Sequence, residues 1–112
     1  MNTRTHGILD YVVGALLIAA PWLFGFRDNE AASWTAIIVG ALTICYSLFT
    51  DYEFSLSRVL PMSTHLAMDY AGGIFLAISP WLLGFAEYVY LPHLIVGILE
   101  VAAAAMTRRQ PV

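Results

Sequence analysis

Apolar residues along the chain fall into four long blocks that are separated by short polar segments. The blocks cover roughly residues 7–26, 32–50, 66–86 and 90–107. Each block approaches the ~20 residues that a helix needs to cross the ~30 Å hydrocarbon core of a membrane. A helix closes all its backbone hydrogen bonds within one segment, as hydrocarbon requires. The pattern therefore predicts an all-α bundle of four transmembrane helices.

The first and third blocks are two versions of one sequence. Residues 5–26 return as residues 64–85, and 11 of these 22 aligned positions are identical. The second and fourth blocks match at a spacing of 57, as in Ile38-Val39-Gly40 and Ile95-Val96-Gly97. We therefore predict one integral membrane domain, 1–112, made of two tandem helical hairpins: repeat one at 5–50, repeat two at 64–107 and a linker at 51–63. Each hairpin crosses the membrane twice, so the two repeats enter it in parallel orientation.

Composition and charge agree with a membrane protein and suggest its orientation. Hydrophobic residues make up 60% of the 112 residues and charged residues 12%, against about 25% charged in soluble domains. Lysine is absent, and four of the five arginines, Arg4, Arg58, Arg108 and Arg109, fall on one side of the predicted bundle. The positive-inside rule then places both termini and the linker in the cytoplasm. A net charge of −3 offers no basic patch to nucleic acid.

Most of the duplicated residues share one face of their helix. On a helical wheel they form a stripe that we expect to pack against other helices. Gly14 and Gly73 would let two backbones approach, which predicts that the first and third helices face each other. Pro21 and Pro80 should bend the helix ends, and the hydroxyl of Ser79 is placed to satisfy a carbonyl that Pro80 leaves free. The predicted helix-packing stripe consists of His6, Asp10, Gly14, Pro21, Gly25, His65, Asp69, Gly73, Pro80 and Gly84.

The duplicated aromatic residues and threonines mark the ends of the predicted spans. Tyr11, Trp22, Tyr70 and Trp81 lie off the stripe, where amphipathic rings suit the lipid headgroup level, and we expect them to be interfacial anchors. Each hairpin should start at a threonine N-cap, either Thr5 or its copy at position 64.

The candidate chemistry of the chain lies in its buried ionisable residues. His6 and Asp10 are one helical turn apart, as are His65 and Asp69, so each pair can meet on its own helix. Three interpretations remain open: structural pairs that fix helix entry and pack the two repeats against each other, a site that handles protons or ions, and a metal site. The shallow position of both pairs favours the structural interpretation, and we expect no metal and no cofactor. Glu100 interrupts the fourth block, and we expect it to contact a partner subunit or extend toward the cytoplasmic face; with Asp10 and Asp69 it is also a possible proton or partner contact.

Enzymatic activity is not expected from this sequence. No serine, cysteine or lysine nucleophile is paired with a base, and no glycine-rich phosphate loop is present. Cys45 lies within the second apolar block. It is the single cysteine, so a disulfide within the chain is impossible. A haem carrier would need two inward histidines, and His6 with His65 would be the pair.

The duplicated Pro-Trp-x-x-Gly-Phe motif and the His-x-x-x-Asp-Tyr motif before it are similar to those of a known family. With Ser79-Pro80-Trp81 in the second copy and Ala20-Pro21-Trp22 in the first, the chain resembles the SPW-repeat family of small prokaryotic integral membrane proteins over nearly its whole length. The resemblance implies a location in the prokaryotic cytoplasmic (inner) membrane and an architecture of repeated hairpins. It implies no activity, cofactor or site residue.

Two functions from different classes follow. The first is a non-enzymatic accessory or scaffold subunit that packs against a larger respiratory, photosynthetic or transport assembly, because a bundle this small fills its interior with side chains. Its partners would be the lipid bilayer and other membrane-protein subunits or further copies of itself. The alternative is a small oligomeric conductor of protons or ions that uses Asp10, Asp69 and Glu100.

Overall fold

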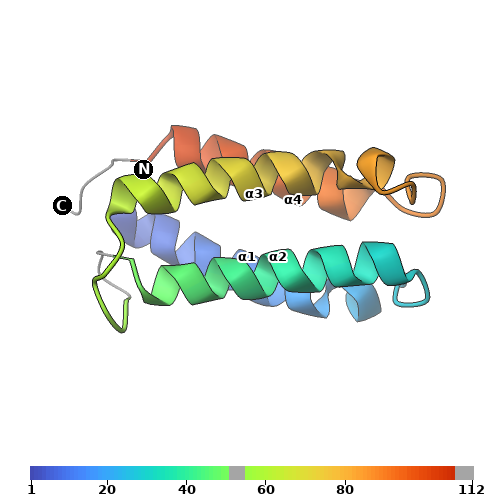
Figure 1. Ribbon diagram of the computed structural model, residues 1–112, viewed down its shortest axis with the longest axis horizontal. Helices are drawn as coiled ribbons and strands as arrows, with labels where there is room; N and C mark the ends of the chain where they lie inside the picture. The colour runs from blue at the N-terminus through green and yellow to red at the C-terminus, as the bar shows by residue number, and fades with distance from the viewer. Residues whose placement is uncertain (51–54, 108–112) are drawn as a thin grey trace.

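The computed structural model describes residues 1–50 and 55–107, and within these residues the fold consists of four helices. These are α1 (Thr3–Leu23), α2 (Glu30–Leu48), α3 (Met62–Leu82) and α4 (Leu91–Ala105) (Figure 1). Apart from one isolated bridge between Thr50 and Leu60, the described residues contain no β structure. The predicted all-α class with four helices is confirmed. The linker residues 51–54 and the two arginines of the tail, Arg108 and Arg109, lie outside the described residues.

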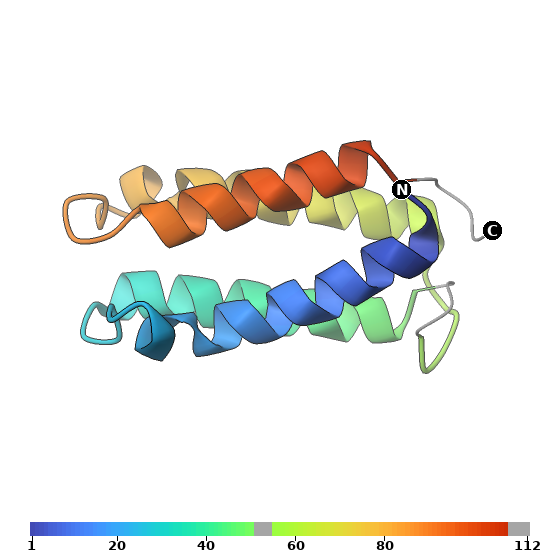
Figure 2. The ribbon, with the colours of Figure 1, turned by 180° about the vertical axis from the view of Figure 1, so that it is seen from behind.

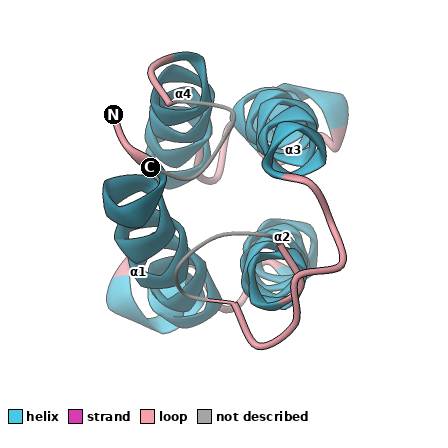
Figure 3. Cartoon of the chain, turned by 90° about the vertical axis from the view of Figure 1, so that its left-hand side faces the viewer, coloured by secondary structure: helices cyan, strands magenta, loops and turns pink. Residues whose placement is uncertain are grey.

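The helices form two hairpins, α1 with α2 and α3 with α4, which lie side by side. The N-terminus, the start of α3 and the segment 55–60 are at one end of the bundle, here called the terminal end, and the α1–α2 and α3–α4 turns are at the other, here called the turn end (Figures 1 and 2). Seen along its length, the bundle places one helix at each corner of a square, with α1 diagonally opposite α3 (Figure 3).

Glycines bring the helices of each hairpin into backbone contact. A Cβ atom on Gly40 of α2 would lie 2.6 Å from the carbonyl oxygen of Gly14, and one on Gly97 of α4 would lie 2.5 Å from that of Gly73. No real side chain fits at such distances, so these contacts require glycine. The prediction that Gly14 and Gly73 join the first helix to the third was wrong, because each glycine packs against the second helix of its own hairpin.

The duplicated Pro-Trp-x-x-Gly-Phe motif ends α1 and α3 in the same way. Gly25 and Gly84 have φ values of 72° and 78°, a left-handed conformation that favours glycine. The amide of Phe26 then donates to the carbonyl of Pro21 at 2.9 Å, the long bond of a Schellman cap, and the corresponding bond to Pro80 measures 2.8 Å. The two phenylalanines are 1% and 3% exposed, so the motif both ends a helix and inserts an aromatic ring into the core.

Two local predictions at the helix ends have opposite outcomes. Ser79 Oγ donates to the carbonyl of Leu76 at 2.7 Å, which is the acceptor that Pro80 leaves without its amide, as expected. The threonine N-caps were wrong, because Thr5 lies within the first turn of α1. Asn2 is the cap there, and its side chain accepts the Thr5 amide at 2.8 Å.

Helix length and composition single out two candidate membrane spans among the described residues. α1 and α2 are long and apolar enough to cross a membrane. α3 has 21 residues, as α1 does, but no stretch of it reaches the hydropathy of these two candidates, and α4 is apolar but has 15 residues. The four apolar blocks predicted four spans. Helix length and composition support two of these spans, α1 and α2.

We predict that Gly97→Ala destabilises the bundle whereas Gly72→Ala does not. A Cβ at Gly97 meets backbone and side-chain atoms at 2.5–2.7 Å, while one at Gly72 meets nothing within 4 Å. Overpacking of this kind costs about 1–3 kcal/mol, whereas glycine to alanine in an open helical position gains up to about 1 kcal/mol. Thermal unfolding of the purified variants, followed by helical circular dichroism, measures both. Equal melting temperatures for the two variants would contradict the close contact of α3 with α4.

Candidate functional site

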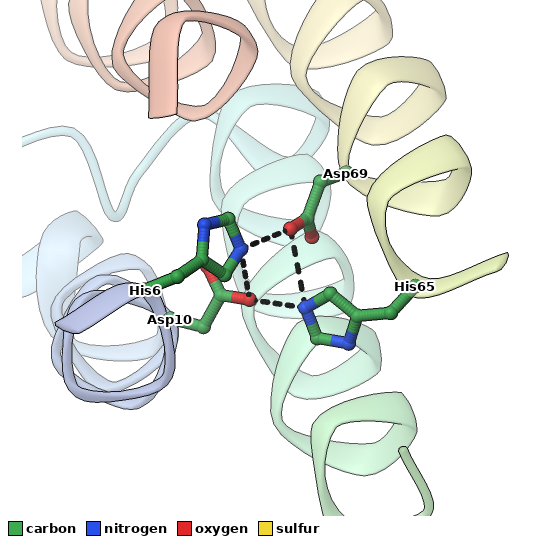
Figure 4. Close-up of side chains that lie close together, drawn as sticks. All are labelled: His6, Asp10, His65 and Asp69. Carbon is green, nitrogen blue, oxygen red and sulfur yellow. Dashed lines mark hydrogen bonds and ion pairs between the residues drawn. The ribbon is translucent and has the colours of Figure 1, made fainter. Parts of the chain in front are cut away.

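The ionisable residues of the duplicated stripe meet inside the bundle near its terminal end. His6 and Asp10 come from α1 and His65 and Asp69 from α3, and Figure 4 shows the four side chains pointing toward one another. They are 0–1% exposed. We call them the His–Asp quartet. The diagonal placement of α1 and α3 turns the same face of both helices toward the bundle axis, which is why residues 59 positions apart come together.

The shortest contacts of the quartet join the two hairpins. His6 Nε2 lies 2.6 Å from Asp69 Oδ2, and His65 Nε2 lies 2.5 Å from Asp10 Oδ2. The contacts within each helix, from His6 to Asp10 and from His65 to Asp69, are longer at 3.0 and 3.2 Å. Each histidine therefore makes its closest contact with the aspartate of the opposite repeat rather than with the one expected on its own helix.

Two threonines show that the Nδ1 atom of each histidine carries a proton. Thr50 Oγ1 lies 2.8 Å from His65 Nδ1, and Thr107 Oγ1 lies 2.8 Å from His6 Nδ1. Both hydroxyls already donate their only proton to a backbone carbonyl one turn earlier, at 2.6 and 2.5 Å. Each hydroxyl can therefore only accept from the imidazole, so Nδ1 of both histidines carries a proton. The Nε2 atoms face the centre of the quartet.

The two aspartates of the quartet have different surroundings despite the duplication. Tyr46 donates its hydroxyl to Asp69 Oδ1, and its ring packs edge-on against that of His65. At the spacing of 57 that relates α2 to α4, the position of Tyr46 is taken by Ala103, which has no hydroxyl. Asp10 Oδ1 consequently has no hydrogen-bond partner, although it is buried.

Glu100 is a second buried acid near the quartet. It is 4% exposed and its Oε1 atom makes no hydrogen bond. Its Cβ lies close to Gly73 on the inner side of the α3–α4 contact, and the four residues of the quartet are the charged groups that act on it. Because the side chain lies inside the bundle, neither the expected contact with a partner subunit nor an extension toward the surface fits its position.

The remaining residues of the predicted stripe lie toward the turn end and serve the helix contacts and caps described above. There His93, which is 1% exposed, lies between the rings of Phe26 and Phe85 and contacts the carbonyl of Ala32 at 2.9 Å. The rings of Phe26, Phe85 and His93 thus pack together between the helices at the turn end, and we call these three residues the aromatic plug.

The four predicted anchors divide into two kinds. Trp22 and Trp81 are 60% and 56% exposed near the turn end, and Tyr70 is 37% exposed. Tyr11 is partly buried and packs against a small cluster around Met62 near the terminal end. Exposure is compatible with anchoring for three of them, and their position in lipid stays a prediction.

Reasoning from sequence missed the polar groups that support the quartet. Thr50 and Thr107 match at the spacing of 57, so their repetition is a signal that could have identified them. Tyr46 has no counterpart in the second repeat and gave no such signal. Its role depends on how α2 packs against α3, which the sequence does not state.

Comparison with known proteins identifies the family. A family model described as the SPW repeat domain matches residues 4–107. The chain belongs to the SPW repeat domain family. This SPW repeat domain therefore spans both hairpins and the quartet between them, and the resemblance noted in its sequence is confirmed. No curated protein and no solved structure gave a significant match.

The chemistry available to this SPW repeat domain follows from its buried charges. Two histidines and two aspartates without access to water must be neutral as a group, because an uncompensated charge in such surroundings costs several kcal/mol. Two imidazolium and two carboxylate groups meet this condition. So do two neutral imidazoles and two carboxylates around a divalent cation. The quartet can thus hold either two protons or one metal ion at its centre.

Proposed function

We propose that this protein is a non-enzymatic integral membrane accessory or scaffold subunit, which spans the cytoplasmic membrane with four helices and packs against a larger membrane-protein complex. The observation that carries the proposal is the distribution of polarity, with charged groups inside and large apolar side chains outside. Eleven apolar residues in the middle of the helices are 39–59% exposed, namely Ile8, Val12, Trp34, Ile38, Leu42, Ile74, Phe75, Ile78, Ile95, Ile98 and Leu99. A surface of this kind is a liability in water and is suited to lipid and to other helices.

The dimensions of the bundle support four spans. Its longest extent is 42 Å, close to the ~40–45 Å of a bilayer with its headgroups. α1 and α3, with 21 residues each, would be about 31 Å long. α4 is about 22 Å long by the same measure and would span with local thinning of the bilayer or with help from the residues that flank it.

The charges favour an orientation with both termini in the cytoplasm of a prokaryotic cell. Arg4 and Arg58 belong to the terminal end, whereas Arg27 follows α1 at the turn end. The positive-inside rule then assigns the terminal end to the cytoplasm. The quartet would lie near the cytoplasmic boundary, which lowers the cost of burying its charges.

The accessory role is favoured over catalysis because the reactive groups are not accessible. The quartet, the only buried cluster of histidine and aspartate in the described part of the chain, is 0–1% exposed, so no substrate can reach it. The bundle instead offers apolar grooves on its outside. Two of these grooves line the seam between α2 and α3, with volumes of about 390 and 360 Å³.

The α2–α3 seam is a surface that suits a partner helix. Its two grooves share Ile38, Val39 and Phe75 and therefore form one continuous apolar trough along both helices. Ala71 and Gly72 line it, and a Cβ on Gly72 would meet nothing within 4 Å. Small residues in an open apolar groove allow the close approach of a transmembrane helix from another protein.

A conductor of protons or ions is the second candidate, favoured by the unpaired acid oxygens of Asp10 and Glu100 near Asp69. The apolar core opposes it. Toward the turn end Leu17 and Leu76 are 2% and 0% exposed, and the aromatic plug follows them. A flux in proteoliposomes that Glu100→Gln abolishes would favour this second function over the first.

The arrangement in the membrane is tested with single cysteines introduced into a Cys45→Ala background. Asp28→Cys, near the turn end, should react with a membrane-impermeant maleimide added to intact spheroplasts. Ser57→Cys, near the terminal end, should react only after the membrane is opened. Labelling of both positions from the same side would contradict four spans with cytoplasmic termini.

The accessory role is tested by extraction of the tagged chain from its native membranes in mild detergent. We expect the wild type to carry a stable larger partner. Gly72→Trp should fill the α2–α3 groove and reduce recovery of that partner about tenfold, a loss of about 1.4 kcal/mol. Val12→Trp is the matched control, because Val12 is exposed on α1, away from that seam.

The outcomes of this extraction separate the claims. A wild-type chain that is recovered alone, or only with copies of itself, would contradict the accessory role. Undiminished recovery of a partner with Gly72→Trp would contradict the groove as its docking site, and an equal loss with Val12→Trp would show that bulk on any face is responsible.

A further inference from the structure

We propose that the His–Asp quartet is a binding site for one divalent transition-metal ion of the zinc class. The ligands are His6 Nε2, His65 Nε2 and one carboxylate oxygen each from Asp10 and Asp69. The metal site goes beyond the accessory role and does not depend on it, because all four ligands come from this one chain. It differs from the expectation of no metal, which rested on the shallow position of both His–Asp pairs.

The donor atoms are already gathered around one point. One ligand atom from each of the four residues lies within 4.8 Å of the others, and the contacts between neighbouring donors measure 2.5–3.2 Å. A tetrahedral ion with bonds of about 2.0–2.2 Å holds its donor atoms about 3.4 Å apart. Neighbouring donors would therefore separate by less than about 1 Å, and the most distant donors, up to 4.8 Å apart, would move closer, which side-chain rotation can supply. Imidazole and carboxylate are both ordinary ligands for such an ion.

The threonines prepare both histidines for coordination. Metal-binding histidines usually donate the proton of the other ring nitrogen to a group that fixes the ring, which sets the tautomer and the orientation. Here Thr50 and Thr107 accept the Nδ1 protons and are themselves fixed by backbone carbonyls. Tyr46 similarly holds Asp69. The Nε2 lone pairs of both rings then point into the quartet when those atoms are not protonated.

A separate observation points to a missing ligand. Asp10 is 0% exposed and directed into the quartet, yet its Oδ1 atom has no partner (Figure 4). A bare carboxylate oxygen away from water is costly. A cation between the two repeats would bind one oxygen of this carboxylate and offset the negative charge that Oδ1 shares.

The test uses the full chain, purified in detergent, freed of metal with a chelator and titrated with cobalt chloride. Cobalt(II) reports a low-coordinate site of nitrogen and oxygen ligands by visible absorption, and zinc should displace it. We expect one ion per chain. Asp10→Asn, which removes a charged ligand, should weaken binding by at least about 100-fold.

A second set of variants keeps the test valid where a ligand variant fails to fold. Thr50→Val combined with Thr107→Val leaves the four ligands in place and should weaken cobalt binding by about 10–100-fold. Thr35→Val is the matched control, since Thr35 makes the same hydroxyl bond to its own helix, at 2.6 Å, in the turn-end part of α2 away from the quartet. His93→Gln removes the buried histidine outside the quartet. Both controls should bind cobalt as the wild type does.

Two results would overturn the metal site. The first is a folded wild-type chain that binds no cobalt or zinc at millimolar concentration. The second is binding that His93→Gln abolishes and that Asp10→Asn with the paired threonine variants leaves unchanged, since the ion would then lie elsewhere.

Discussion

Neutralisation of four buried ionisable side chains is the constraint on which the rest of this structure depends. His6, Asp10, His65 and Asp69 have no access to water, so each charge needs an opposite charge at hydrogen-bond distance. No other described ion pair is buried in this way: Arg27 and Asp28, 3.8 Å apart, are largely exposed. The quartet requires α1 and α3 to bring these side chains together, which they do from diagonally opposite corners of the bundle (Figure 3). It therefore sets how the two hairpins are placed against each other.

The duplicated residues have three different physical roles. Glycines hold the two helices of each hairpin together through backbone contact, and the Pro-Trp-x-x-Gly-Phe motif ends the first helix of each hairpin and fills the core with a phenylalanine. The histidines and aspartates then join one hairpin to the other. Within a membrane the hydrophobic effect gives helices little reason to associate, so steric fit and polar contacts of this kind are what remains.

The two copies differ where the quartet departs from symmetry. Tyr46 supports Asp69, but Ala103 stands at the matching position and leaves Asp10 with an unpaired oxygen. Thr43 is likewise replaced by Glu100, whose side chain is buried near the quartet. The second repeat thus lacks this hydroxyl and carries an acid near the quartet instead. This asymmetry creates the bare oxygens from which both the metal site and the conductor hypothesis arise.

Much of the architecture could be predicted from the sequence, whereas the partners of its polar groups could not. Apolar blocks of helical length predicted four helices, and the position of Ser79 before Pro80 predicted its bond to Leu76. Local spacing, however, suggested that His6 would pair with Asp10, because residues four apart on a helix are neighbours. The closer contact with Asp69 depends on the diagonal packing of α1 and α3. Spacing along one helix carries no information about that packing.

The most direct test of this account is a double-mutant cycle on the free energy of unfolding in detergent, with His6→Gln, Asp69→Asn and both together. Residues in one buried network couple by about 0.5–3 kcal/mol, and we expect His6 and Asp69 to reach the upper half of that range. The matched cycle with Asp10→Asn reports the contact within α1. A coupling near zero between His6 and Asp69, together with a clear coupling between His6 and Asp10, would show two independent pairs and contradict a quartet that joins the hairpins.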